Sequence, residues 1–224
     1  MFSVRILIFG WWIIPIMLLA ITDQIDGSEN FVTIDENVIQ QAEKQYGASA
    51  RKRLLAWQEL MRTHDSDVLN TLKKVNHFFN VIPFVSDATH WGVEDYWATP
   101  IEFLASNGGD CEDFATAKYF TLTALGVSEK RLTLTYVKAL RLGQTHLVLA
   151  YYPAPDEEPL VLDNLVDTIE LSSRRTDLLP VYSFNASGLW MAKQRGKGEV
   201  VGEGRRIRPW RELLARMRKI FPQK

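Results

Sequence analysis

The stretch GGDCEDF, residues 108–114, contains the only cysteine of this 224-residue chain, Cys111, with Asp110 before it and Glu112 after it. Glycines followed by acidic residues are typical of a turn that leads into a helix, with Asp110 as the N-cap and Cys111 at the first helical position. A helix N-terminus lowers the pKa of a thiol, whereas adjacent carboxylates raise it. The stretch therefore predicts a helix-start cysteine whose acidic neighbours need a separate explanation.

A second helix should lie immediately before this one. Residues 99–102 place Thr, Pro and Glu at the N-cap, first and third positions of a capping box, which predicts a short helix over residues 100–106. The Asn-Gly-Gly sequence at residues 107–109 should end it, because these residue types readily adopt positive φ. The cysteine helix should end near Gly126.

The rest of the chain divides into helical and extended parts. Apolar residues recur at helical spacing in residues 35–63, with an interruption at Gly47, and again in residues 66–80. Three strands are expected after the cysteine helix, joined by short connections that make the sheet antiparallel. They are residues 131–139, 144–152 and 159–165. The sequence therefore predicts an α+β fold, with N-terminal helices and the cysteine helix packed on an antiparallel sheet.

Composition excludes two classes of site. A formal net charge of -1 and a pI near 6.4 lack the basic excess of a nucleic-acid-binding domain, so no nucleic-acid partner is expected. A single cysteine can form neither an internal disulfide nor a Cys-x-x-Cys metal site. Cys111 is therefore either a packed thiol or a nucleophile.

Both ends of the chain differ from its middle. An uncharged apolar run, residues 6–22, indicates export through a signal peptide or a membrane anchor at residues 1–22. Residues 193–224 are rich in glycine and then in basic residues, with an amphipathic helix expected near the end. That helix is interpreted as docked on the domain or, alternatively, as a patch for an anionic membrane or an acidic partner. The globular domain is placed at residues 30–190.

Two later residues could complete a catalytic site with the cysteine. A thiol nucleophile needs a base, and the base needs a third group that orients it. His146 lies in the second expected strand and Asp163 in the third. If these strands pair, both side chains can point towards the face covered by the Cys111 helix. The order Cys, His, Asp on a helix and two strands is that of the transglutaminase-like cysteine fold.

The acids beside the thiol suit a hard cation. Asp110 and Glu112 lie two residues apart at a loop-to-helix junction, with the carbonyl groups of residues 107–109 nearby. Ca²⁺ takes 6–8 oxygen ligands in flexible geometry, and a bound cation would remove the repulsion between these acids and a thiolate. The alternative is that both acids only cap the helix, which explains Asp110 better than Glu112.

Three stretches resemble the bacterial transglutaminase-like cysteine proteases of the LapG type. They are DYWATPIEFLASNGGDCEDFATAKYFTL (95–122), THLVLAYY (145–152) and LVLDNL (160–165). The resemblance implies a periplasmic, calcium-dependent endopeptidase that cleaves the N-terminal region of large cell-surface adhesins at a small-residue site with paired alanines. Adhesin release then disperses biofilm. The resemblance also implies an inhibitory partner, an inner-membrane cyclic-di-GMP receptor that sequesters the protease.

The resemblance also implies roles for individual residues. Cys111, His146 and Asp163 match the catalytic triad, and Asp110 and Glu112 match the calcium site. Two other functions stay open on the sequence alone. A transglutaminase-type amine acyltransferase uses the same triad with an amine as acceptor, and a non-catalytic module of this fold could bind calcium or an adhesin without cleaving it.

Overall fold

The computed structural model describes residues 33–63, 65–192 and 197–220. The expected signal peptide or anchor at residues 1–22 lies outside these residues. None of the described helices is long and apolar enough to cross a membrane.

The first half of the described chain is helical, as predicted. Gly47, with a φ of 83°, separates the first two helices, so the interruption is a break between two helices. The capping box predicted around Thr99 is present at the start of the fifth helix. The bounds are α1 (Glu36–Tyr46), α2 (Ala48–Arg62), α3 (Val68–Asn80), α4 (Asp87–His90), α5 (Pro100–Ser106) and α6 (Cys111–Ala124).

A seven-stranded antiparallel sheet follows, in the order β4-β3-β2-β1-β5-β6-β7 within the described residues. The three predicted strands form its centre and one side, whereas the four later strands were not predicted. Short 3₁₀ helices η1 (Glu129–Arg131), η2 (Ser172–Arg174) and η3 (Gly204–Arg206) lie in the connections. The strands are β1 (Leu132–Ala139), β2 (Gln144–Tyr151), β3 (Leu160–Leu162), β4 (Glu170–Leu171), β5 (Leu178–Phe184), β6 (Leu189–Ala192) and β7 (Lys197–Gly202).

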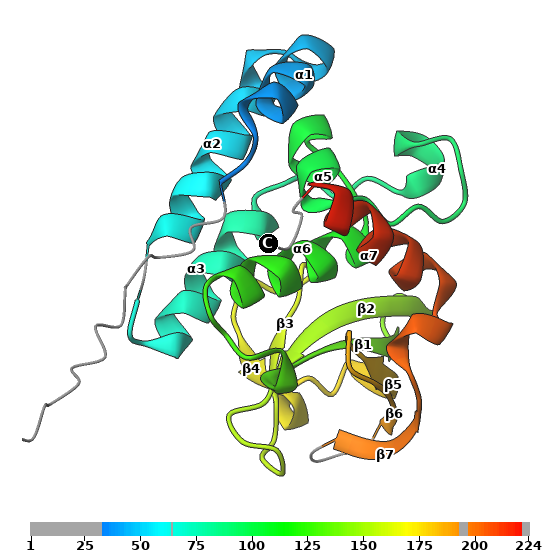
Figure 1. Ribbon diagram of the computed structural model, residues 1–224. Coiled ribbons are helices and arrows are strands. Elements are labelled where there is room, and N and C mark those ends of the chain that lie inside the picture. The colour runs from blue at the N-terminus through cyan, green and yellow to red at the C-terminus, as the bar shows by residue number, and fades with distance from the viewer. Residues whose placement is uncertain (1–32, 64, 193–196, 221–224) are drawn as a thin grey trace, which may run out of the picture. The chain divides into compact units, whose positions relative to one another are not determined.

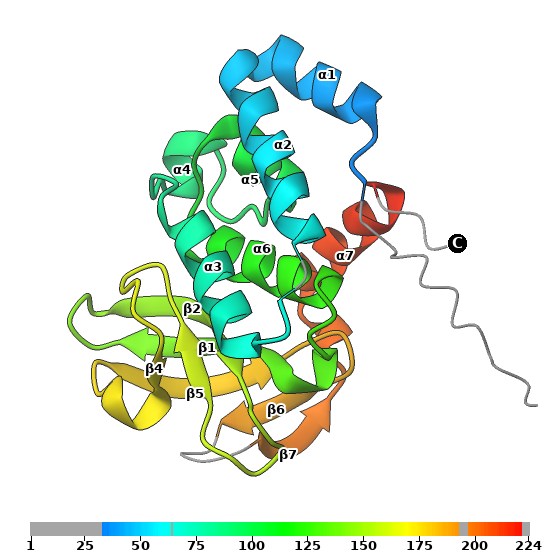
Figure 2. The ribbon, with the colours of Figure 1, turned by 90° about the vertical axis from the view of Figure 1, so that its left-hand side faces the viewer.

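The helices cover one face of the sheet (Figures 1 and 2). Leu147 and Leu149 of β2 belong to the main core, together with Phe114 of α6. Val148, between the two leucines, belongs to a second, smaller cluster with Val161 of β3. Alternate residues of a strand point to opposite faces, so the second cluster lies on the face of the sheet turned away from α6.

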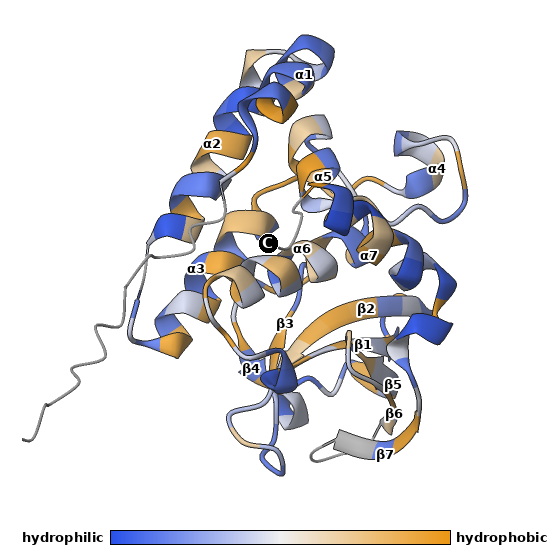
Figure 3. Ribbon diagram, in the orientation of Figure 1, coloured by the Kyte–Doolittle hydropathy of each residue, from blue (hydrophilic) through white to orange (hydrophobic). Residues whose placement is uncertain are grey.

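The last helix, α7 (Arg208–Ile220), is docked on the domain through its apolar residues. Trp210 and Leu213 are both 0% exposed and lie in the main core, and the Trp210 ring stacks on Phe120 of α6 with centroids 5.5 Å apart. Figure 3 shows the hydrophilic residues that otherwise surround this helix. The described part of the basic segment therefore contributes to the same core as the cysteine helix.

Two local predictions need correction. The third strand ends at Leu162, so Asp163 follows it instead of lying within it. Asn107 alone supplies the positive φ after α5, at 59°, and the glycines after it do not. Gly109 is needed for space, because a Cβ there would come within 2.3 Å of the Asp113 carboxylate and 2.7 Å of the Phe103 ring.

Candidate active site and acidic cluster

Cys111 is the first residue of α6, and the turn before it is held from several sides. The N–H of Asp110 donates to Asp113 Oδ2 at 3.3 Å, and Gly109 accepts a hydrogen bond from the N–H of Val85 at 2.9 Å. The thiol is half-buried and donates to Glu112 Oε2 at 2.9 Å. Because the first N–H groups of a helix have no intrahelical acceptor, the N–H of Cys111 can serve an external oxygen.

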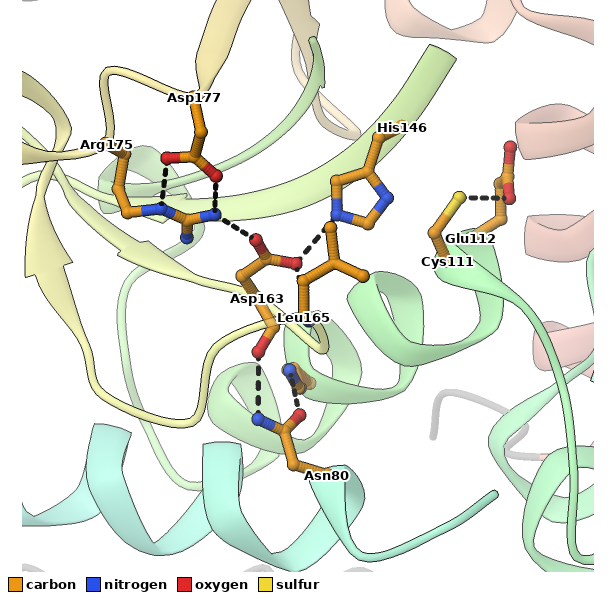
Figure 4. Close-up of polar contacts among 9 residues, drawn as sticks. Asn80, Cys111, Glu112, His146, Asp163, Leu165, Arg175 and Asp177 are labelled. Atoms are coloured by element: carbon orange, nitrogen blue, oxygen red, sulfur yellow. Dashed lines mark hydrogen bonds and ion pairs between the residues drawn. The ribbon is translucent and has the colours of Figure 1, made fainter. Parts of the chain in front are cut away.

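His146 and Asp163 form a direct pair. The Nε2 atom of His146 lies 2.7 Å from Asp163 Oδ1, and both side chains are at most 3% exposed. Figure 4 shows the imidazole between the Asp163 carboxylate and the Cys111 thiol, with its second ring nitrogen on the side of the sulfur. If Nε2 carries the proton that binds Asp163, Nδ1 is left to accept the proton of the thiol.

The sequence-based prediction placed the side chains of His146 and Asp163 on the face covered by α6, on the condition that β2 and β3 pair, and these two strands do pair. His146 alternates with Leu147 of the main core and shares its strand face with Val148 of the second cluster, whereas Asp163 follows the end of β3. Only residues 149–151 of β2 pair with β3, which leaves the first part of this edge of β2 open. The N–H of Leu147 lies near the sulfur there, so Cys111 reaches His146 at the open edge of the sheet.

Asp163 has partners for every side of its carboxylate. Oδ2 accepts from Arg175 Nη2 at 2.7 Å, and Oδ1 also accepts from the N–H of Leu165 at 3.1 Å. Arg175 is only 3% exposed and binds Asp177 as well, at 2.9 and 3.0 Å. Burial alone would raise the pKa of Asp163, but His146, the Leu165 N–H and Arg175 outweigh burial and lower this pKa to about 2. Asp163 is therefore an anion at neutral pH.

Further hydrogen bonds hold the backbone of Asp163. The side-chain amide of Asn80 donates to its carbonyl oxygen at 2.8 Å, and Lys118 Nζ donates to Asn80 Oδ1 at 2.6 Å. Lys118 is 0% exposed, and burial lowers its pKa to about 7. The carbonyl group of Asp163, directly after the end of β3, is thus bound by a side chain of α3.

The Cys111 side of the site is crowded with acids. One carboxylate oxygen from each of Asp87, Asp110 and Asp113 lies within 4.8 Å of the other two, and one oxygen each of Asp110 and Glu112 lies within the same distance of the Cys111 sulfur. Asp87 Oδ1 and Asp110 Oδ1 are buried without a hydrogen-bond partner in the part of the chain that the structure describes. We call Asp87, Asp110, Glu112 and Asp113 the acidic cluster. Its oxygens, two of them unsatisfied, fit a hard cation such as Ca²⁺.

The ionisation of this cluster is disfavoured without a cation. Burial raises the pKa of Asp87 to about 6, and burial with the charge of Glu112 raises that of Asp110 to about 8. Burial, and then the carboxylates of Glu112 and Asp110, raise the pKa of the Cys111 thiol well above its usual value. A cation among these groups favours their charged forms.

Three residues of the site carry no signal in the sequence. Asp87 lies 23 residues before Asp110 in the chain, and the pairing of Phe84 with Gly109 brings the two together. Arg175 stands beside another arginine in a polar stretch, and Lys118 lies between ordinary helix residues. Their burial depends on packing between distant segments, which local patterns do not reveal.

Residues 47–195 match the family described as bacterial transglutaminase-like cysteine proteinase, BTLCP. The chain belongs to this family. A BTLCP proteinase carries out nucleophilic catalysis through a cysteine, and Cys111 is the only cysteine of the chain. Among curated proteins, none matches the chain significantly.

Solved structures of LapG from Legionella pneumophila are similar over most of the chain. The EGTA-treated form is 44% identical, with a TM-score of 0.71, and the match covers 81% of this chain and 96% of LapG. The calcium-bound form is 45% identical, with a TM-score of 0.69, and the match covers 81% of this chain and 98% of LapG. LapG has thus been solved with calcium bound, and the acidic cluster is the place among the described residues of this chain that could hold a metal ion.

Proposed function

We propose that this BTLCP proteinase is a periplasmic, calcium-dependent endopeptidase that cleaves the N-terminal region of a large cell-surface adhesin. Adhesin release would control biofilm dispersal, and an inner-membrane cyclic-di-GMP receptor would act as the inhibitory partner. The observation that carries the proposal is the placement of His146 between Asp163 and the thiol at the start of α6 (Figure 4). The calcium-bound LapG structure supports the cation requirement.

The chemistry is acyl transfer to water. The Cys111 sulfur attacks a peptide carbonyl while His146 takes the thiol proton, and the protonated imidazole then returns a proton to the leaving amine. Asp163 fixes the orientation of the ring and stabilises its positive charge. The N–H of Cys111 donates to the developing oxyanion. Water then releases the acyl group, with His146 again acting as the base.

The predicted calcium ligands are Asp110 and Glu112, and the structure adds Asp87 and Asp113 as neighbouring carboxylates. A bound calcium ion would neutralise these charges and hold the turn that carries Cys111. The unpartnered Oδ1 atoms of Asp87 and Asp110 are the acceptors that such an ion would satisfy. The acids beside the thiol then serve to fix its position without repelling the thiolate.

The decisive experiment incubates the full chain with the N-terminal fragment of a large adhesin encoded in the same genome, with calcium or with a calcium-selective chelator. We expect one cut with calcium and none with chelator. Cys111→Ala should abolish the cut and keep the thermal unfolding profile, and replacing a paired-alanine site in the substrate should prevent it. Residual cleavage by Cys111→Ala would refute the nucleophile assignment.

The remaining outcomes separate the alternatives. Cleavage in chelator would keep the protease and reduce Asp110 and Glu112 to helix caps. A crosslinked product in mass spectrometry would indicate amine transfer instead of hydrolysis. Binding of the fragment without any product would favour the non-catalytic module.

A further inference from the structure

The described part of α7 lies beyond residues 47–195, the part matched by the family model, yet one of its basic residues faces the domain. Arg211 and Arg218 are exposed, whereas Arg216 is partly buried. Its guanidinium donates from Nη2 to the carbonyl oxygen of Trp97 and lies over the ring of Tyr96, 4.6 Å from the centroid. Arg216 therefore contacts the loop that leads into α5.

This loop is fixed from the opposite side as well. The hydroxyl of Tyr96 donates to Glu102 Oε1 at 2.9 Å, and Glu102 is the third residue of the capping box that starts α5. The Tyr96 ring is thus held between a helix start and the guanidinium of Arg216. A planar guanidinium suits this position, because it can stack on a ring and donate in its plane at the same time.

Two N–H groups of the same loop bind the acidic cluster. The N–H of Tyr96 donates to Asp87 Oδ2 at 2.6 Å, and the N–H of Ala98 donates to Asp113 Oδ1 at 2.6 Å. The carbonyl of Trp97 and the N–H of Ala98 belong to one planar peptide group. That single peptide accepts from Arg216 on one side and donates to Asp113 on the other. Hydrogen bonds in such a chain polarise and strengthen one another.

We propose that Arg216 is a positioning residue for the calcium site, which links the C-terminal helix to the acidic cluster through residues 96–98. The inference rests on the calcium binding put forward above and adds a residue outside the matched segment. Arg216 holds the loop, and the loop holds one oxygen of Asp87 and one of Asp113. The other oxygen of Asp87, Oδ1, has no hydrogen-bond partner within the described residues and would be available to the ion. Partners that orient metal ligands in this way are expected to affect affinity strongly.

The direction in which removal of Arg216 changes calcium affinity shows whether this residue positions the site or acts only through its charge. A guanidinium near a cation site repels the cation, so removal of its charge alone would tighten calcium binding. Loss of positioning has the opposite effect. We therefore measure calcium affinity by isothermal titration of the full chain, and compare Arg216→Gln with Arg211→Gln, which removes the same charge from an exposed position on the same helix.

We expect Arg216→Gln to weaken calcium binding by about tenfold and Arg211→Gln to leave it unchanged or slightly tighter. Arg216→Lys keeps the charge but loses the planar stacking, so it should also weaken binding, to a smaller extent. This second variant tests the proposal even if Arg216→Gln folds poorly, which thermal unfolding in chelator would reveal.

Equal or tighter binding by both Arg216 variants would overturn the proposal. If the unsubstituted chain binds calcium in that experiment, the calcium requirement of the proposed function survives and only the role of Arg216 fails. Absence of calcium binding by the unsubstituted chain would overturn both.

Discussion

The two sides of the His146 imidazole differ in charge balance. On the far side, Asp163 and Asp177 share the buried cation Arg175, and every oxygen of Asp163 has a partner. On the thiol side, four carboxylates gather around the start of α6, and within the described residues no Lys or Arg forms an ion pair with them. The chain thus supplies a cation of its own to one half of the candidate site, whereas the acidic cluster on the other half could hold a metal ion.

The largest expected effect is a loss of activity on the far side of His146, where Asp163 and Arg175 form an ion pair. Asp163→Asn should lower the rate of substrate cleavage by roughly 10⁴-fold, the scale known for loss of the aspartate in catalytic triads. An amide cannot stabilise the imidazolium. It also offers only one acceptor, so either His146 or Arg175 faces a donor. Steady-state kinetics with the adhesin fragment measure this loss.

Asp177→Asn is the matched control, because it leaves the contact between Arg175 and Asp163 in place. Its activity should stay close to that of the unsubstituted chain. Near-normal activity of Asp163→Asn would mean that Asp163 does not orient His146 as a base. The difference in charge between the two sides of His146 would then have no bearing on catalysis.

Sequence reasoning reached the parts of this site that local signals specify. The end of α5 at Asn107, the helix start at Cys111 and the capping box of α5 each depend on a few consecutive residues, and each is present. His146 and Asp163 were singled out because a polar residue in an apolar strand is unusual, and the structure places them 2.7 Å apart.

The parts that sequence reasoning missed depend on how distant segments meet. Strand alternation does not show where β3 ends or where the edge of β2 opens. Asp87 and Arg175 look like ordinary surface residues in the sequence, since only the tertiary packing buries them. Charge balance around a buried group is therefore a property that a single sequence does not reveal.

The second expected effect is a loss of stability when the buried cation Arg175 is removed. Arg175→Met should lower the free energy of unfolding by about 3–5 kcal/mol, because it leaves the Asp163 carboxylate, which is 1% exposed, without its cationic partner. Urea denaturation measures the change. The exposed neighbour Arg174, changed to Met, should shift the free energy by less than about 0.5 kcal/mol. Equal effects of both changes would show that Arg175 does not balance the site.

The third effect is a pH dependence of stability. The pKa of Asp163 is lowered from 3.8 to about 2, so its charged form favours the folded state. This contribution is present above pH 4 and is lost as the pH falls from about 4 through 2, and it amounts to about 2 kcal/mol. Urea denaturation between pH 5 and pH 2 should show the loss, and Asp163→Asn should lack this part of it. An identical pH profile for both proteins would contradict the low pKa.

The smallest expected effect is a change in stability caused by a substitution in the acidic cluster, and the sign of this change depends on calcium. In chelator, Asp110→Asn should raise the free energy of unfolding by about 1 kcal/mol, because it removes a buried carboxyl whose pKa burial and Glu112 raise to about 8. With calcium, the same change should lower stability relative to the unsubstituted chain, because a ligand of the ion is lost.

Thermal unfolding of both proteins in both conditions measures this reversal. Asp177→Asn, which loses a contact with Arg175, should lower stability with and without calcium. If Asp110→Asn behaved like Asp177→Asn, the carboxylates around Cys111 would be balanced within the protein, and no cation would be needed to explain why acids flank the thiol. A reversal at Asp110 alone would mean that the chain tolerates an unfavourable cluster in order to place its nucleophile under the control of an external ion.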